Sequence, residues 1–149
     1  MAFSSFFQST LAALSIAMPL SAAAAVPADS NPLAAERWKT RPVVVVVPQA
    51  GDALLRKVET ALRKTTTREA FIEREMVLYT VVAGEGRRNH KQMAPAQTRA
   101  LLAALKLDAA GPPTFVLVGK DGGVKLTEGP QVDLQAVFAE IDRMPMRQR

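Results

Sequence analysis

The strongest structural signal in the chain is the stretch Gly111-Pro-Pro-Thr-Phe-Val-Leu-Val-Gly-Lys-Asp-Gly-Gly-Val-Lys125. Its two prolines favour a turn, and the run from Thr114 to Val118 that follows predicts a buried strand. Asp121-Gly122 stands between this run and Val124-Lys-Leu126, where a tight turn needs the positive φ angles that Asp and Gly tolerate. The stretch therefore predicts a proline turn, a buried strand and an antiparallel hairpin in succession.

Two other buried strands are predicted upstream of this hairpin. Val43-Val-Val-Val-Val47 consists of β-branched residues, which is typical of a strand covered on both faces of a parallel or mixed sheet. The run from Met76 to Ala83 has the same character. Helices are expected between and after these strands, beginning after the N-cap residues Asp52 and Asp133 and at Pro95, which suits a first helical turn.

The predicted order of elements is strand, helix, strand, helix, strand, hairpin strand, helix. The polar, glycine-containing segment from Gly84 to Met93, between the second strand and the second helix, is predicted to be a solvated loop. Two βαβ passages followed by an antiparallel hairpin indicate an α/β protein with a mixed four-stranded sheet flanked by helices. This is the thioredoxin-like arrangement.

The N-terminal segment has the features of a secretory signal peptide. Residues 1–28 are uncharged, and an apolar run from Leu11 to Leu20 is followed by small residues up to Ala25. Cleavage is expected after Ala25, with Ala28 as the second choice, which leaves residues 26–149 as a single domain. A basic start is missing, so an uncleaved membrane anchor is the alternative, although the apolar run is short for a span. We expect an exported protein, periplasmic or extracellular, with no membrane span after cleavage.

The composition narrows the classes of partner. The 149 residues include 19 Lys and Arg against 14 Asp and Glu, a net charge of +5, and no cysteine. The two signs of charge are mixed, which is not the footprint of a nucleic-acid-binding protein but suits a soluble protein near anionic envelope components. Without disulfides, the fold must depend on packing and hydrogen bonds.

Three stretches carry a resemblance to a known family: Trp38-Lys-Thr-Arg-Pro42, Gly119-Lys-Asp-Gly-Gly-Val-Lys125 and Ile141-Asp-Arg-Met-Pro-Met-Arg147. They resemble motifs of an uncharacterised thioredoxin-like domain family, the 4174 family of domains of unknown function. It occurs singly in exported bacterial proteins, and repeated or fused in animal extracellular-matrix and sushi-repeat proteins. The resemblance implies a thioredoxin-like fold and, for the animal members, matrix or adhesion roles, with no established reaction. The Pro113-Thr114 step is also similar to the cis-proline step of thioredoxins.

Cysteine-dependent redox chemistry is excluded for this chain. In a redox thioredoxin the reactive cysteines stand just after the first strand, where the helix N-terminus lowers a thiol pKa. The corresponding stretch here, Pro48-Gln-Ala-Gly-Asp-Ala53, has no thiol, and Asp52 is expected to cap the helix instead. Pro113, Asp121 and Gly122 are likewise expected to be structural. We therefore expect no catalytic residue and no cofactor.

The candidate ligand contacts are Arg87, Arg88, His90 and Lys91, all within the segment from Gly84 to Met93. Their local excess of positive charge would suit an anion or a glycan, and the alternative is a solvated loop without a ligand. A single histidine without cysteines or clustered carboxylates does not make a zinc site, so no metal is expected.

The leading hypothesis from the sequence is a non-enzymatic exported domain, used for binding or structure in the cell envelope or periplasm. Its partner would be an envelope protein or a glycan, and not a nucleic acid. The alternative is a redox-accessory protein that binds thiol-containing peptides beside Pro113 without exchanging electrons. The sequence leaves open the identity of the partner, the oligomeric state and whether the Pro112–Pro113 bond is cis.

Overall fold

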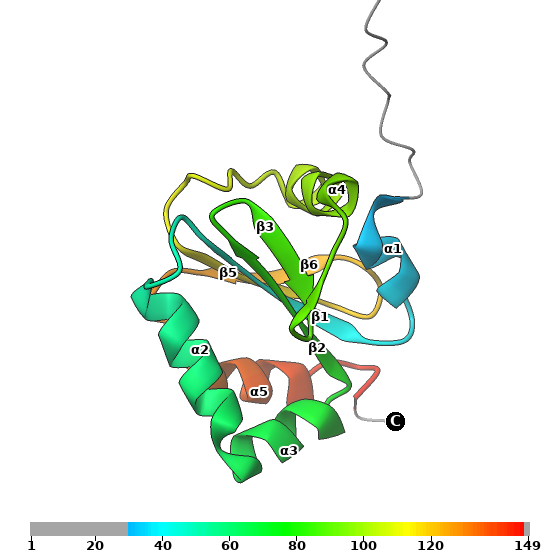
Figure 1. Ribbon diagram of the computed structural model, residues 1–149. Coiled ribbons are helices and arrows are strands. Elements are labelled where there is room, and N and C mark those ends of the chain that lie inside the picture. Colours follow the sequence, from blue (N-terminus) through cyan, green and yellow to red (C-terminus); the bar gives the residue numbers. More distant parts are fainter. Residues whose placement is uncertain (1–29, 148–149) are drawn as a thin grey trace, which may run out of the picture.

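The computed structural model describes residues 30–147, and its elements form three layers (Figure 1). In chain order they are α1 (Pro32–Glu36), β1 (Arg41–Val47), α2 (Ala53–Arg63), α3 (Thr65–Glu73), β2 (Met76–Val82), β3 (Glu85–Arg88), β4 (Lys91–Gln92), α4 (Pro95–Leu105), β5 (Thr114–Val118), β6 (Val124–Glu128) and α5 (Leu134–Asp142). The sheet is the middle layer, with α2, α3 and α5 packed on one face and α1 and α4 on the other.

The strands form one mixed sheet in the order β4-β3-β2-β1-β5-β6. β1 and β2 are parallel, and every other neighbouring pair is antiparallel. The α/β class with a mixed sheet and helices on both faces is thus confirmed, whereas the prediction of four strands is wrong. The four predicted strands stand side by side as β2-β1-β5-β6, and β3 and β4 extend the sheet beyond β2.

The burial of β1 explains its unbroken run of valines. Val43, Val45 and Val47 belong to the core beneath α2, α3 and α5, whereas Val44 and Val46 belong to the core beneath α1 and α4. Successive side chains of a strand point to opposite faces, so a strand covered on both sides needs an apolar residue at every position. All five valines are at most 1% exposed.

The predicted loop from Gly84 to Met93 is a β-meander, so that prediction is wrong. Its strands are held to β2 and to each other by antiparallel pairing, and both of its turns have two residues. The first turn, Ala83-Gly84, has φ angles of 49° and 83°, and the second, Asn89-His90, has 45° and 69°. Such left-handed pairs match the twist of a hairpin.

Asp52, Asp121 and Gly122 have the structural roles predicted for them, in a helix cap and a hairpin turn. The Asp52 carboxylate accepts a hydrogen bond from the Leu54 amide at 2.8 Å and caps α2. In the β5–β6 turn, Gly122 has a φ of 84°, and Asp121 accepts from the Gly123 amide at 3.0 Å. No peptide bond in residues 30–147 is cis, so the Pro112–Pro113 bond is trans and the likeness to a cis-proline step does not extend to its geometry.

Nothing in the described range has the length and apolar character of a helix that could cross a membrane. The expected signal peptide, with its cleavage sites after Ala25 and Ala28, lies outside the described residues.

Candidate functional site

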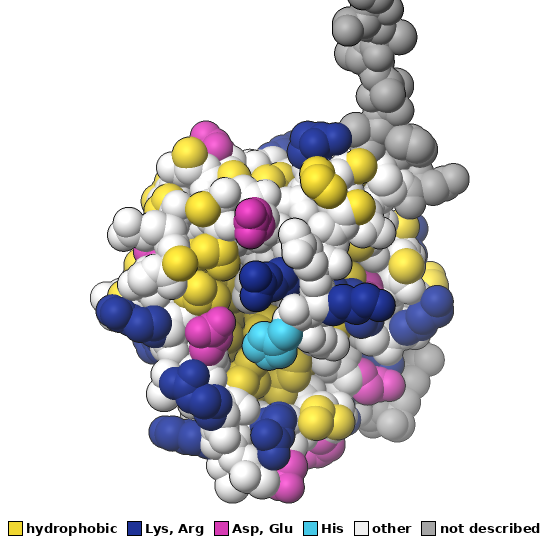
Figure 2. All heavy atoms as spheres, viewed as in Figure 1, with side chains coloured by type: hydrophobic (Ala, Val, Ile, Leu, Met, Phe, Trp, Pro, Cys, Tyr) yellow, Lys and Arg dark blue, Asp and Glu magenta, His cyan; other side chains and the backbone are white. Residues whose placement is uncertain are grey.

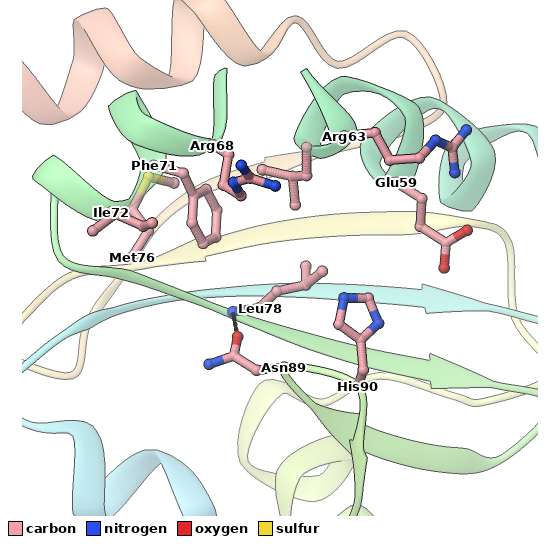
Figure 3. Close-up of a pocket in the computed structure, with 10 residues that line it drawn as sticks. Glu59, Arg63, Arg68, Phe71, Ile72, Met76, Leu78, Asn89 and His90 are labelled. Carbon is pink, nitrogen blue, oxygen red and sulfur yellow. Dashed lines mark hydrogen bonds between the residues drawn. The ribbon is translucent and has the colours of Figure 1, made fainter. Parts of the chain in front are cut away.

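A cleft opens on the face of the sheet that carries α2 and α3, beside the β3–β4 turn (Figures 2 and 3). Its main part, called here the apolar hollow, has a volume of about 630 Å³. Carbon-rich side chains line most of this hollow: Leu62, Phe71, Ile72, Met76 and Leu78. Its charged and polar lining comes from Glu59, Arg63, Arg68, Asn89 and His90. The volume lies within the 300–1,000 Å³ that is usual for ligand sites.

A second hollow continues the cleft along β2 and β3, and it is called here the polar hollow. It has a volume of about 470 Å³, and its lining includes Thr80, Glu85 and Arg87. Glu59 and His90 line both hollows and therefore mark their junction. The two hollows together make a bipartite cleft, with carbon surface at one end and hydrogen-bonding groups at the other.

The cleft exists because the helices cover the two faces of β3 unequally. On one face α4 lies so close that a Cβ at Gly86 would stand 2.2 Å from the Thr98 hydroxyl oxygen. On the other face, Glu85 and Arg87 line the polar hollow. The sheet thus extends past α2 and α3 on this side, and the face of β2 that carries Met76, Leu78, Thr80 and Val82 becomes the floor of the cleft.

His90 is held in the cleft by a strained turn. Its φ of 69° lies in the left-handed region, which non-glycine residues adopt at a cost. Asn89 anchors the turn, because its amide donates to the Leu78 carbonyl at 2.8 Å and its Oδ1 accepts from the Leu78 amide at 3.1 Å. The imidazole projects from this turn between the sheet and α2, with the Glu59 carboxylate directed toward it (Figure 3). Backbone strain of this kind is often found at binding and active sites.

The charges around the cleft are only partly compensated. Arg63 donates to the Thr60 hydroxyl at 2.7 Å, and its side chain is directed away from His90 (Figure 3). For Arg68 and Arg87, no ion pair is formed with any of residues 30–147. These two guanidinium groups are therefore available to a negatively charged ligand. In Figure 2 the single histidine stands among hydrophobic side chains, with basic side chains around the rim.

The four candidate contacts from the sequence do not form one cluster. Arg87 and His90 line the cleft, whereas Arg88 and Lys91 do not. Arg88 lies opposite Lys91 in the β3–β4 pair, and directly opposed residues share a face of the sheet. Arg88 points toward α1, where its Nε donates to Glu36 at 2.6 Å. The hairpin therefore divides the four residues between the two faces.

The contacts of Arg88 belong to a buried polar cluster on the far side of the sheet. Glu36 is only 5% exposed, and it also accepts from the Tyr79 hydroxyl at 2.6 Å and from the Thr40 hydroxyl at 2.7 Å. Burial alone would raise the pKa of Glu36, but the hydrogen bonds from Arg88, Tyr79 and Thr40 outweigh it and lower that pKa. Burial, together with the bond to Glu36, raises the pKa of the Tyr79 phenol. This cluster joins α1 to β2 and β3 and has a structural role.

Sequence reasoning missed the floor of the cleft and four of its charged residues, Glu59, Arg63, Arg68 and Glu85. The apolar residues of the floor follow the periodicity of a helix or a strand, which predicts that they are buried in the core. Nothing in the sequence marks the place where no helix covers the sheet. Pro113, beside which a peptide site was considered, lines neither hollow. Across residues 30–147, no three His, Cys, Asp or Glu side chains come together as a metal site.

Comparison with known proteins identifies the family. The model of the domain of unknown function DUF4174 matches residues 32–149, which include the three stretches that carry the resemblance. No curated protein and no solved structure matches the chain. Because the family model covers most of the sequence, the chain belongs to the DUF4174 family.

Proposed function

We propose that this chain is an exported, non-enzymatic binding domain of the thioredoxin-like type that acts in the cell envelope. The bipartite cleft between α2–α3 and the β2–β3–β4 part of the sheet is the observation that carries the proposal. It combines a carbon-lined hollow, a polar hollow and unpaired guanidinium groups at one place. Surface hollows with an apolar lining and a few converging polar groups are the usual form of ligand sites.

The thioredoxin-like part of the proposal is supported by the strand order β2-β1-β5-β6, with helices on both faces. The place where that fold carries its reactive thiols is the N-terminus of α2, which follows β1. Here Asp52 occupies the capping position and bonds to the Leu54 amide. The carboxylate already compensates the positive end of the helix, so an anionic ligand gains little there. Binding is therefore proposed at the cleft and not at this helix end.

Export to the envelope is proposed from the uncharged N-terminus and its apolar run. A partner that displays both apolar and anionic groups would suit the cleft and the net charge of +5. Expression of the full chain, followed by fractionation and mass measurement, tests this part. A mature chain that begins at Val26 in the periplasm or the medium supports export, and an intact chain in the cytoplasm contradicts it.

The test of the cleft uses anilinonaphthalene sulfonate, a fluorescent probe with an apolar ring system and one negative charge. We expect saturable binding to the folded protein, with changes in two-dimensional amide NMR spectra that are confined to residues lining the two hollows. Ile72→Ser should weaken this binding, because Ile72 is 65% exposed and extends the apolar lining to the rim.

The matched control for this test is Val124→Ser. Val124 is also an exposed apolar side chain, at 52%, but it lies on β6 and lines neither hollow. Its replacement should leave probe binding unchanged. Spectral changes scattered over the surface, or equal effects of the two variants, would contradict a binding role for the cleft.

A further inference from the structure

We infer that the ligand of the cleft is a free, single-chain amphiphile with one negative charge. Its hydrocarbon chain would lie in the apolar hollow, and its acidic head would lie beside Arg87 in the polar hollow. The inference rests on the proposed binding function and names the chemical class of the ligand. The two hollows meet at Glu59 and His90. The cleft therefore has a mainly apolar part joined to a polar part, as an amphiphile has a hydrocarbon chain joined to a polar head.

The apolar hollow favours a hydrocarbon chain over a peptide. Its floor is a face of β2, which is an interior strand paired with β1 on one side and β3 on the other. Beyond the end of β3, the main-chain groups of Leu78 are bonded to Asn89. A peptide in this hollow would bury its own N–H and C=O groups without a strand edge to pair with, which is unfavourable. A hydrocarbon chain has no such groups to satisfy.

The rim of the apolar hollow is also made of carbon. Ile72 is 65% exposed at the outer edge, whereas Phe71, Met76 and Leu78 below it are buried. A chain seated on Leu78 would cover the exposed part of Ile72 as well. Removing this surface from water is favourable in proportion to its area. A purely polar glycan would leave the same surface uncovered.

The polar hollow suits a head group with a single negative charge. Arg87 projects into it from β3, without an ion pair to the other described residues, and the Thr80 hydroxyl lies in the same lining. A guanidinium group binds a carboxylate through two parallel hydrogen bonds. Glu59 and Glu85 also line this hollow, so a head with two or more negative charges would be repelled. One carboxylate therefore fits better than a phosphate dianion.

The balance of charge over the whole cleft favours an anionic ligand over a cationic one. Arg87 is the guanidinium group of the polar hollow, and Arg63 and Arg68 line the apolar hollow, against Glu59 and Glu85 in the cleft as a whole. The chain has a net charge of +5. The same positive excess opposes the seating of a second copy of this chain in the cleft. An anionic amphiphile is thus the occupant that satisfies both the carbon lining and the charge.

The experiment is calorimetric titration of the protein, below the critical micelle concentration, with dodecanoate, dodecanol and dodecyltrimethylammonium. We expect dodecanoate to bind most tightly and dodecanol about tenfold more weakly, as for a lost charged hydrogen bond. Decanoate should bind roughly fifteenfold more weakly than dodecanoate, because each buried methylene contributes about a factor of four. Arg87→Gln should weaken the binding of dodecanoate about tenfold and leave the binding of dodecanol unchanged.

The matched control is Lys91→Gln, which removes a positive charge from the same hairpin. Lys91 lies opposite Arg88 on the other face of the sheet, so its replacement should leave dodecanoate binding unchanged. Equal affinity for the anionic, neutral and cationic chains would overturn the inference about the head while the cleft remains a binding site.

Two further outcomes would also overturn the inference. The first is displacement of anilinonaphthalene sulfonate by an apolar peptide or a glycan, but not by dodecanoate. The second is binding to phosphatidylglycerol vesicles without binding of monomeric dodecanoate. If neither the probe nor any amphiphile occupies the cleft, the proposed function fails together with the inference.

Discussion

Replacing His90 by glycine should stabilise the fold and weaken ligand binding at the same time. His90 has a φ of 69° at the second position of the Asn89-His90 turn, where glycine is the preferred residue. A left-handed conformation costs a non-glycine residue about 1–2 kcal/mol. Glycine removes that strain but lowers the stability by roughly 0.5–1 kcal/mol, because it increases the conformational entropy of the unfolded chain. The net expectation is therefore a gain of about 0.5–1 kcal/mol in the free energy of unfolding.

Three variants separate the contribution of the backbone from that of the imidazole. His90→Gly should raise the melting temperature by roughly 2–4 °C, as expected for this free energy in a domain of this size. His90→Ala keeps the strained backbone and removes the ring, so its stability should stay near that of the wild type. Lys106→Gly relieves a φ of 55° at the C-cap of α4, away from the cleft, and should stabilise the fold about as much as His90→Gly.

The assays are urea unfolding and titration with dodecanoate. Both replacements of His90 should weaken dodecanoate binding by roughly tenfold, the worth of one hydrogen bond to a charged group. Lys106→Gly should bind dodecanoate like the wild type. A His90→Gly variant no more stable than His90→Ala would refute the reasoning from backbone strain. Unchanged binding by both His90 variants would remove the imidazole from the site.

Three other substitutions test the remaining structural assignments. Gly86→Ala should lower the free energy of unfolding by roughly 1–3 kcal/mol, because the added methyl group would collide with Thr98, and urea unfolding measures this loss. Glu36→Gln should cost roughly 1–3 kcal/mol at neutral pH by weakening the bonds to Tyr79 and its other donors. Because the pKa of Glu36 is lowered on folding, its carboxylate stabilises the fold at pH values above its ordinary pKa of 4.5. The difference in free energy of unfolding between the wild type and Glu36→Gln should therefore vanish as the pH falls through the lowered pKa, and unfolding curves recorded at several pH values measure it. Asp52→Ala should cost about 1 kcal/mol through the lost cap of α2, and an unchanged melting temperature would contradict that role.

The central part of the fold was predictable because burial on both faces leaves a pattern in the sequence. Val43 to Val47 predicts an interior strand, and Asp121-Gly122 predicts the hairpin turn of β5 and β6. The caps at Asp52 and Asp133 could be predicted for the same reason, since in each the side-chain carboxylate accepts a local hydrogen bond from the backbone amide two residues on. Signals of this kind depend on a few neighbouring residues and hold in most tertiary contexts.

The β-meander from Gly84 to Met93 was missed because its strands are short and nearly all polar. Of the four residues of β3, only Gly86 is buried, and glycine has low strand propensity. Its stability comes from tertiary contacts: pairing with β2, the close approach of α4, and the bonds between Asn89 and Leu78. The cleft was missed together with the meander, because its polar half is made from β3 and its junction from the turn that carries His90.

The three stretches that carry the sequence resemblance lie outside the cleft, and their contacts hold the fold together. The Trp38 amide donates to the Lys120 carbonyl at 2.7 Å, and the Lys120 ammonium pairs with Glu75. Arg147 pairs with Glu73 and with Asp142 at the end of α5. None of the residues in the three stretches lines either hollow. A resemblance carried by such contacts predicts the fold, and the ligand has to be inferred from cleft residues such as Arg87 and His90.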